Sequence, residues 1–260
     1  MKLDFFKMHT QGNDYIYFDF IEIETPKIDF SKLAIKLCKR HFGIGADGIV
    51  LILKDDDSEA FMKIFNADGS EGKMCGSALM CVSSYLGKKF NKKTLNIDTI
   101  SGIRTGLILD KKFNEVKINM GSPEIISKEP LTVENFSGYL VQIGNKHFVT
   151  FINNLSADMA AKYGPFIENN KSFPDGINVE FVKIKSKNSI EMSVWERGSG
   201  ATLSCGTGAC ASVYAGIMYD LLSDTVKVKL PGGEVFVEYE NGDIFLTGRI
   251  SFVYSGTVEV

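Results

Sequence analysis

The sequence predicts an α+β protein of two pseudo-symmetric domains, each a many-stranded mixed sheet or barrel wrapped around a central helix. Three observations predict this fold class. A set of short motifs recurs at an offset of about 130 positions, half of the 260 residues. Each half is rich in short β-branched and aromatic segments that are typical of strands. Each half also contains one segment with helical spacing that is apolar on every side, as expected of a helix inside a protein.

The repeated motif is a strand end, a Gly/Ser turn and a Cys-Gly step into a helix. The first copy is Phe65-Asn66-Ala67-Asp68-Gly69-Ser70 with Cys75-Gly76-Ser77-Ala78, and the second is Trp195-Glu196-Arg197-Gly198-Ser199-Gly200 with Cys205-Gly206-Thr207-Gly208. Asp47-Gly48-Ile49 recurs as Asp175-Gly176-Ile177, and Gly12-Asn13 recurs as Gly144-Asn145, in the same order. Several matches at a nearly constant offset indicate a duplicated domain.

In the first half, the pattern predicts strands at 5–8, 15–20, 49–53, 61–65, 95–99, 104–109 and 115–120. It predicts helices at 28–41, with Ser31 as N-cap, and at 75–90. In the second half, strands are expected at 140–143, 147–152, 179–184, 190–196, 225–230, 235–239 and 244–248, and helices at 156–164 and 205–221.

The boundary between the domains is expected near Gly121-Ser122-Pro123. A final strand at 250–260 could return to the first domain. The expected domains are therefore 1–117 with 250–260, around the Cys75 helix, and 118–249, around the Cys205 helix.

Composition excludes several classes of function. A formal net charge of −3 argues against a nucleic-acid partner, which normally requires a basic stripe. No apolar run approaches the ~18 residues of a membrane span, and the N-terminus has no apolar core of a signal peptide. Five cysteines, an odd number, fit a reducing compartment better than a disulfide scaffold. We therefore expect a cytoplasmic protein that acts on a small molecule and has no membrane partner.

The two Cys-Gly steps predict a site for acid–base chemistry on a carboxylate. Backbone N–H groups in the first turn of a helix are unpaired and attract anions, and small side chains let a carboxylate approach them. The same field lowers the pKa of a cysteine from about 8.5 toward neutral. Cys75 and Cys205, presented by equivalent helix starts, suit an enzyme that removes a proton from one face of a carbon and returns one to the other. Cys38, Cys81 and Cys210 lie in apolar sequence and are expected in the core.

Two segments resemble the signatures of the diaminopimelate epimerase family: Asn66-Ala67-Asp68-Gly69-Ser70-Glu71 with Met74-Cys75-Gly76, and Glu196-Arg197-Gly198 with Cys205-Gly206-Thr207-Gly208-Ala209-Cys210. His9, Gly12-Asn13-Asp14, Asp47-Gly48 and Gly144-Asn145 follow in the family's order. The resemblance implies two similar domains with the substrate in the cleft between them. It also implies conversion of LL-diaminopimelate to the meso form, on the route to lysine and peptidoglycan, in a cytoplasmic homodimer with no cofactor. Cysteine and histidine are too few and too scattered for a zinc pattern, so no metal is expected.

The resemblance implies a role for each matching residue. Cys75 and Cys205 resemble the catalytic thiolate–thiol pair, and His147 and Glu196 resemble the polar partners that set which thiol is ionised. The N–H groups of the first helical turns would hold the reacting carboxylate, and a second set would hold the rest of the substrate. The first set is Gly76, Ser77, Gly206 and Thr207, and the second is Asn13, Asn66, Asn145, Asn178 and Arg197.

The sequence departs from the family pattern at Ser77-Ala78, Lys146 and Ala201, where the family usually has Asn-Gly, Pro and Glu. These departures affect the choice of substrate more than the reaction, so a pyridoxal-independent racemase of another amino acid, such as histidine or proline, is one alternative. A Cys–His acyl-transfer or thiol redox protein is another, but it leaves the duplicated cysteine unexplained. An isomerase of the same fold without the cysteines is disfavoured because both cysteines are present.

Overall fold

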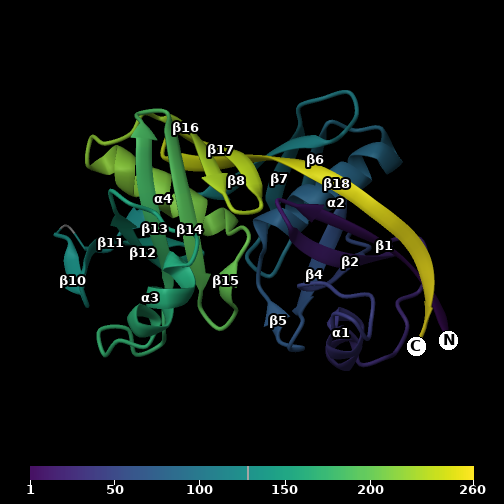
Figure 1. Ribbon diagram of the computed structural model, residues 1–260. Coiled ribbons are helices and arrows are strands. Elements are labelled where there is room, and N and C mark those ends of the chain that lie inside the picture. The colour runs from purple at the N-terminus through teal and green to yellow at the C-terminus, as the bar shows by residue number, and fades with distance from the viewer. Residues whose placement is uncertain (128) are drawn as a thin grey trace. The chain divides into compact units, whose positions relative to one another are not determined.

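The computed structural model describes residues 1–127 and 129–260. The chain divides into two compact units, one of Met1–Ile118 with Gly248–Val260 and the other of Asn119–Thr247. Figure 1 shows a helix surrounded by strands in each of them. The predicted α+β class, rich in mixed sheet, is confirmed. The units are described one at a time.

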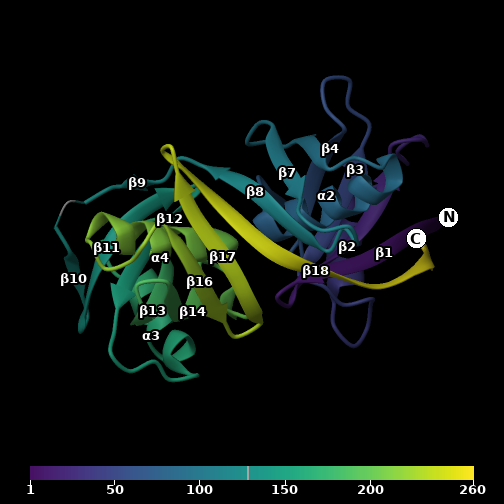
Figure 2. The ribbon, with the colours of Figure 1, turned by 90° about the horizontal axis from the view of Figure 1, so that it is seen from above.

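The first unit contains two helices and a set of short strands. The helices are α1 (Phe30–Cys38) and α2 (Gly76–Phe90). The strands are β1 (Lys2–Thr10), β2 (Asn13–Phe20), β3 (Gly48–Leu53), β4 (Ala60–Asn66), β5 (Glu71–Gly72), β6 (Thr94–Asp98), β7 (Arg104–Ile108) and most of β8 (Glu115–Gly121). The C-terminal part of β18 (Asp243–Glu259) pairs with β1 and is the long yellow strand in Figure 2.

The second unit repeats this inventory. Its helices are α3 (Met159–Glu168) and α4 (Gly206–Met218). Its strands are β9 (Glu124–Ile125), β10 (Leu131–Val133), β11 (Phe136–Ile143), β12 (Asn145–Phe151), β13 (Asn178–Ser186), β14 (Ser189–Glu196), β15 (Gly200–Thr202), β16 (Thr225–Leu230), β17 (Gly233–Glu240) and the start of β18.

Strand pairing follows the same plan in both units. In the first, β1–β2, β3–β4 and β4–β5 are antiparallel, whereas β2–β3 and β4–β6 are parallel. In the second, β11–β12, β13–β14 and β14–β15 are antiparallel, whereas β12–β13 and β14–β16 are parallel. In each unit one helix joins the first pair of parallel strands and another joins the second pair. This shared topology is the structural form of the sequence repeat.

The helix that follows each cysteine is the buried one. Eleven residues of α2 and nine of α4 are buried, on all sides of each helix, as its apolar sequence predicts. α2 packs against β1, β2, β6 and β7, and α4 packs against β11, β12, β13 and β17. Cys38, Cys81 and Cys210 are buried among apolar residues, so the predicted core placement is confirmed.

The other helix of each unit covers the outer face of the sheet. Leu33, Ala34 and Leu37 of α1 join a core with Ile16, Phe18 and Ile49 of β2 and β3. Ala160 and Ile167 of α3 join a second core with Phe148, Val179 and Phe181 of β12 and β13. Each sheet therefore has apolar side chains on both faces, which explains why its strands are nearly continuous hydrophobic runs.

Three predicted details differ from the structure. The N-cap of α1 is Asp29, whose carboxylate accepts from the Lys32 N–H at 3.1 Å, while the Ser31 hydroxyl donates to the Gly69 carbonyl. α3 begins three residues later than expected and continues past Pro165. The strands expected at 244–248 and 250–260 are one continuous strand, β18. None of the described helices is long and apolar enough to cross a membrane.

Candidate active site

Cys75 lies at the start of α2, where an extended backbone turns into the helix. It is the N-cap residue, with φ −138° and ψ 120°, and its side chain is half-buried. The Tyr15 hydroxyl donates to its Sγ at 3.5 Å, and Asn13 Nδ2 lies 3.9 Å from the same atom. Both donors come from β2. Hydrogen bonds donated to a sulfur favour its thiolate form.

The strand that holds these donors is anchored by a compact ion-pair network. The Asp14 carboxylate forms ion pairs with Lys7 and with Arg40, each at 2.7 Å. Arg40 also forms an ion pair with Asp47 at 3.1 Å. The Asp14 backbone N–H donates to the Asp47 carboxylate at 3.1 Å. The network fixes the residue between Asn13 and Tyr15, and so the direction in which both side chains point.

Asn66, the predicted substrate ligand of the first unit, lies at the end of β4. Its amide donates to the Ser70 hydroxyl at 3.0 Å, and that hydroxyl donates to Asp68 at 2.6 Å. These contacts close the Gly/Ser turn before Cys75. Gly76 and Ser77, the first residues of α2, are both buried.

Cys205 occupies the same place at the start of α4 but in a different environment. It is the N-cap, with φ −131° and ψ 110°, and only 4% of it is exposed. Its Sγ accepts from the Gly208 N–H at 3.4 Å and lies 3.5 Å from the Thr207 hydroxyl. The helix start therefore does supply a donor to this sulfur, as the sequence pattern predicts.

The expected fall in thiol pKa is not found at Cys205. Burial raises its pKa well above the usual value, and the negative charges of Glu196 and Glu180 raise it further. The hydrogen bonds from Thr207 and Gly208 oppose this shift without cancelling it. The helix-start argument fails here because it omits the carboxylates that lie beside the sulfur. Burial and the two carboxylates therefore favour the thiol form of Cys205.

His147 and Glu196 lie near Cys205 in the same unit. His147, on β12, is completely buried, and its Nδ1 is 2.7 Å from Oε1 of Glu180. Glu196, at the end of β14, accepts from the Thr202 hydroxyl at 2.5 Å and is hydrogen-bonded to the Cys205 thiol. Burial raises the pKa of Glu196, and the Glu180 charge adds to this effect.

Two of the remaining predicted ligands of the second unit, Asn178 and Arg197, are joined by a hydrogen bond. Asn178 donates to the Lys146 carbonyl at 3.2 Å and accepts from the Arg197 backbone N–H at 2.9 Å. The exposed Arg197 guanidinium donates to the Asp175 carbonyl at 3.0 Å, so part of it stays available to a carboxylate. Asn145 is exposed at the start of β12.

Sequence reasoning missed two residues that touch the site. Tyr15 was assigned only to a strand, although its offset from His147 is close to that of the repeat. Glu180 stands in the apolar run Val179-Glu180-Phe181-Val182, and an acidic residue there is the signal that could have drawn attention to it. Each of these side chains comes from a strand that is distant in sequence from the cysteine beside it. No local pattern reveals such a contact.

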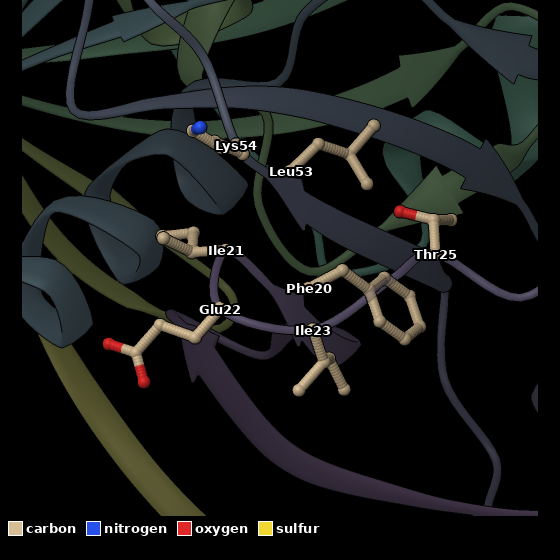
Figure 3. A pocket seen from close by; sticks show the side chains of 7 residues that line it. All are labelled: Phe20, Ile21, Glu22, Ile23, Thr25, Leu53 and Lys54. Carbon is tan, nitrogen blue, oxygen red and sulfur yellow. The ribbon is translucent and has the colours of Figure 1, made fainter.

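The residues described by the structure offer no group of three or more His, Cys, Asp and Glu arranged to hold a metal ion. A shallow pocket lies where β2 and β3 end (Figure 3). Its lining is Phe20, Ile21, Glu22, Ile23, Thr25, Leu53 and Lys54, none of which belongs to the predicted site.

Comparison with known proteins gives consistent matches over the whole chain. The family model described as "Diaminopimelate epimerase" matches residues 5–126 and 139–253. A diaminopimelate epimerase of Halothermothrix orenii is 41% identical, over 100% of this chain and 99% of the relative. One of Carboxydothermus hydrogenoformans is 40% identical over 98% of each chain, and one of Methanococcus maripaludis is 39% identical over 99% and 100%.

Solved structures share the fold at low sequence identity. A hydroxyproline epimerase from Agrobacterium vitis with bound trans-4-hydroxy-L-proline has a TM-score of 0.71 at 14% identity, covering 99% of this chain and 92% of its own. A phenazine biosynthesis protein of the PhzF family from Bacillus anthracis has a TM-score of 0.72 at 15% identity, covering 100% of both chains. These similarities establish the two-domain fold of this chain.

Proposed function

The chain belongs to the diaminopimelate epimerase family, and we propose that it converts LL-diaminopimelate to meso-diaminopimelate by exchanging the proton on one α-carbon. The proposal depends on one observation above all: two equivalent helices each begin at a cysteine, within a chain that matches this family along its length. The enzyme is an isomerase, since its product has the same atoms as its substrate.

In the proposed reaction the two sulfurs act on opposite faces of the same carbon. One thiolate takes the α-proton, and the electrons of the broken C–H bond move onto the carbon and its carboxylate. The other sulfur gives its S–H proton to the opposite face, so that configuration inverts and the thiolate and thiol exchange roles. Cys75 and Cys205 are the two groups, and catalysis by a positioned acid and base contributes typically 10²–10⁴-fold.

We assign the stabilisation of negative charge to the helix starts. The backbone N–H groups of Gly76 and Ser77 and of Gly206 and Thr207 belong to the first turns of α2 and α4. Donors fixed at such positions stabilise charge that develops on a carboxylate during proton removal. This would replace the electron sink that a pyridoxal cofactor provides, so no cofactor is needed. Exhaustive dialysis against a chelator should leave the rate unchanged, and loss followed by recovery with a metal would contradict this.

The second amino-acid end of diaminopimelate requires its own ligands. We assign it to Asn13, Asn66, Asn145, Asn178 and Arg197, as the family resemblance implies. The chemistry agrees, because Arg can bind a carboxylate through two hydrogen bonds and Asn carbonyls can accept from an ammonium group. Arg197 has one contact to the Asp175 carbonyl and an exposed side chain, which suits a residue that meets substrate from solution.

Racemisation of a different amino acid is the second candidate, favoured by Lys146, Ser77-Ala78 and Ala201. Lys146 is exposed next to Asn145, where it adds a cation at the edge of the proposed site. Purified protein should therefore be incubated with LL-diaminopimelate and, separately, with L-histidine, L-proline and L-lysine, and the products separated by chiral chromatography. The main proposal expects inversion of diaminopimelate only. Faster inversion of a single-ended amino acid would favour the second candidate.

We also propose that the enzyme acts in the cytoplasm as a homodimer. All five cysteines are free, as expected in a reducing compartment. Phe252, Val253 and Tyr254 of β18 are 55%, 48% and 41% exposed, an apolar stretch that a second copy could cover. Light scattering during size-exclusion chromatography should give twice the chain mass, and Tyr254→Lys should lower it. A wild-type mass of 28.7 kDa would contradict the dimer.

A further inference from the structure

The two units place different side chains at three equivalent positions around their cysteines. β2 pairs with β3 in the register Tyr15 to Gly48 and Tyr17 to Val50. β12 pairs with β13 in the register His147 to Asn178 and Val149 to Glu180. Superposing these registers makes His147 the counterpart of Tyr15, and Glu180 the counterpart of Val50. In the helices, Gly208 corresponds to Ala78.

Glu180 is the member of this set that sequence and reaction leave unexplained. It has no exposed surface, and its Oε1 lies 2.7 Å from His147 Nδ1. Among the described residues, its Oε2 and the His147 Nε2 are both buried without a hydrogen-bond partner. A buried carboxyl group with one partner costs stability, so its presence in the otherwise apolar run Val179-Glu180-Phe181-Val182 indicates another role.

Gly208 shows where this carboxyl group lies relative to the thiol. A Cβ added at Gly208 would be 2.7 Å from Oε1 of Glu180 and 3.3 Å from Sγ of Cys205. The two atoms therefore border the same small space, which stays open because Gly208 has no side chain. In the first unit, Val50 brings no charge to the equivalent place, and the buried Ala78 fits there.

The titratable groups around Cys205 come from three neighbouring strands of the sheet. They are His147 from β12, Glu180 from β13 and Glu196 from β14. Two acidic groups thus face one thiol. The first unit instead presents Cys75 with the Tyr15 hydroxyl and the Asn13 amide, which are hydrogen-bond donors. The surroundings of the two cysteines are therefore unequal before substrate arrives.

We propose that Glu180 is a positioning residue that makes the two cysteines unequal. Its carboxylate accepts the Nδ1–H of His147 and keeps Cys205 in the thiol form. The resting enzyme then holds its transferable proton on Cys205, while Cys75 is the sulfur that first removes a proton. The assignment of these roles depends on the proposed epimerase function. The tests below use no substrate, so they can fail or succeed independently of that function.

The first test is the pH dependence of Cys205 alkylation in the wild type and in Glu180→Gln. Glutamine keeps the size of the side chain and removes the charge. Iodoacetamide labelling followed by peptide mass spectrometry measures each cysteine separately, with Cys75 as the internal reference. In Glu180→Gln the pH midpoint of Cys205 alkylation should be about one pH unit lower than in the wild type. Labelling of Cys205 at pH 8 should therefore be roughly tenfold faster. Coincident profiles for Cys205 in the two proteins would overturn the proposal.

Glu191→Gln is the matched control. Glu191 lies on the neighbouring strand β14 and is paired with Lys229 at 3.2 Å, away from α4. The Glu191→Gln substitution removes the same charge from the same sheet. The pH dependence of Cys205 alkylation in this variant should therefore match that of the wild type. An equal change in both variants would show that net charge, not the position of Glu180, is responsible, and would also overturn the proposal.

A second measurement is made on the wild type and leaves the buried Glu180–His147 pair intact. The chain has three histidines, so the ¹⁵N signals of His147 can be assigned by elimination, using His9→Asn and His41→Asn to identify the other two. Nδ1 should be protonated, because it donates to an ionised Glu180. A bare Nδ1 that accepts a proton from a neutral Glu180 would contradict the proposal whatever the alkylation result.

Discussion

The groups that contact Cys75 and Cys205 differ, and the proposed two-base reaction predicts what substitution of each sulfur should do. Cys75→Ser and Cys205→Ser each keep a hydroxyl in place of the sulfur, but a serine hydroxyl is far less acidic than a thiol. Epimerisation should fall by at least about 10²-fold in either variant, because a two-base reaction needs both groups. The rate of meso-diaminopimelate formation checks this. Cys38→Ala, at a buried position outside the site, should retain activity.

The serine variants also offer their own test of folding. A misfolded variant would lose all chemistry. With one sulfur intact, each should still eliminate a leaving group from a β-substituted diaminopimelate analogue, since elimination needs a single base. Epimerisation close to the wild-type rate by either variant would refute the assignment of the two thiols.

Arg197 tests the substrate assignment at the residue scale. Arg197→Lys keeps the charge but loses the planar fork that can bind a carboxylate through two bonds. We expect binding of diaminopimelate to weaken by about 1.5–3 kcal/mol, seen mainly as a higher KM. Arg249→Lys, at an exposed position on β18, is the control. Unchanged kinetics for Arg197→Lys would favour a substrate with a single amino-acid end.

At the element scale, the third residue of the helix is Ala78 in α2 and Gly208 in α4. Gly208→Ala in α4 places a carbon 2.7 Å from the Glu180 carboxylate and 3.3 Å from the Cys205 sulfur, so one of them must move. Activity should fall by about tenfold or more. The mirror-image change Ala78→Gly in α2 should cost about 1 kcal/mol of stability through helix propensity and leave the rate within a few fold. Similar kinetics for the two variants would contradict the description of the α4 start.

Elements of five or more residues could be predicted from the sequence, and the shortest could not. The short β-branched and aromatic runs of β1 to β4 and the apolar sequences of α2 and α4 are strong local signals. β5, β9, β10 and β15 have two or three residues each, and only pairing with a neighbour makes them strands. Asp29 rather than Ser31 caps α1 because the Ser31 hydroxyl is used by the Gly69 turn, a tertiary contact.

The site shows the same division between local and tertiary information. Both cysteines were predicted at helix starts because Cys-Gly followed by small residues is a local pattern, and both are N-caps. The thiol pKa of Cys205 was predicted in the wrong direction. The shift in its pKa depends on burial and on the charges of Glu196 and Glu180, which lie on β14 and β13. The sequence of the helix does not show that these carboxylates lie beside the sulfur.

At the scale of the whole molecule, the ion-pair network at Asp14 should make stability depend on pH. Burial raises the pKa of Asp14, but the bonds to Arg40 and Lys7 outweigh this and lower it below its usual value. A carboxyl group with a lowered folded-state pKa stabilises the fold above its unfolded pKa of 3.8 and loses this effect as pH falls through the folded pKa.

Asp14→Asn should therefore destabilise the protein by about 3 kcal/mol at pH 7, the lower end for breaking a buried pair. The difference from the wild type should shrink as the pH is lowered through 4. Urea unfolding across a pH series measures both effects, and Asp56→Asn, at an exposed position, is the control. A loss of stability that is the same at every pH would show that packing, not charge, is responsible.

The duplicated architecture places one cysteine at the start of a buried helix in each unit, and the central proposal is that both sulfurs act on one carbon. The most direct test is LL-diaminopimelate in deuterated water at low conversion. The account predicts that the first meso product contains one deuterium at the inverted carbon while the remaining LL substrate contains none, because one sulfur removes protium and the other delivers solvent deuterium. Meso product that retains protium would instead indicate a single base that returns the same proton, and would contradict the account.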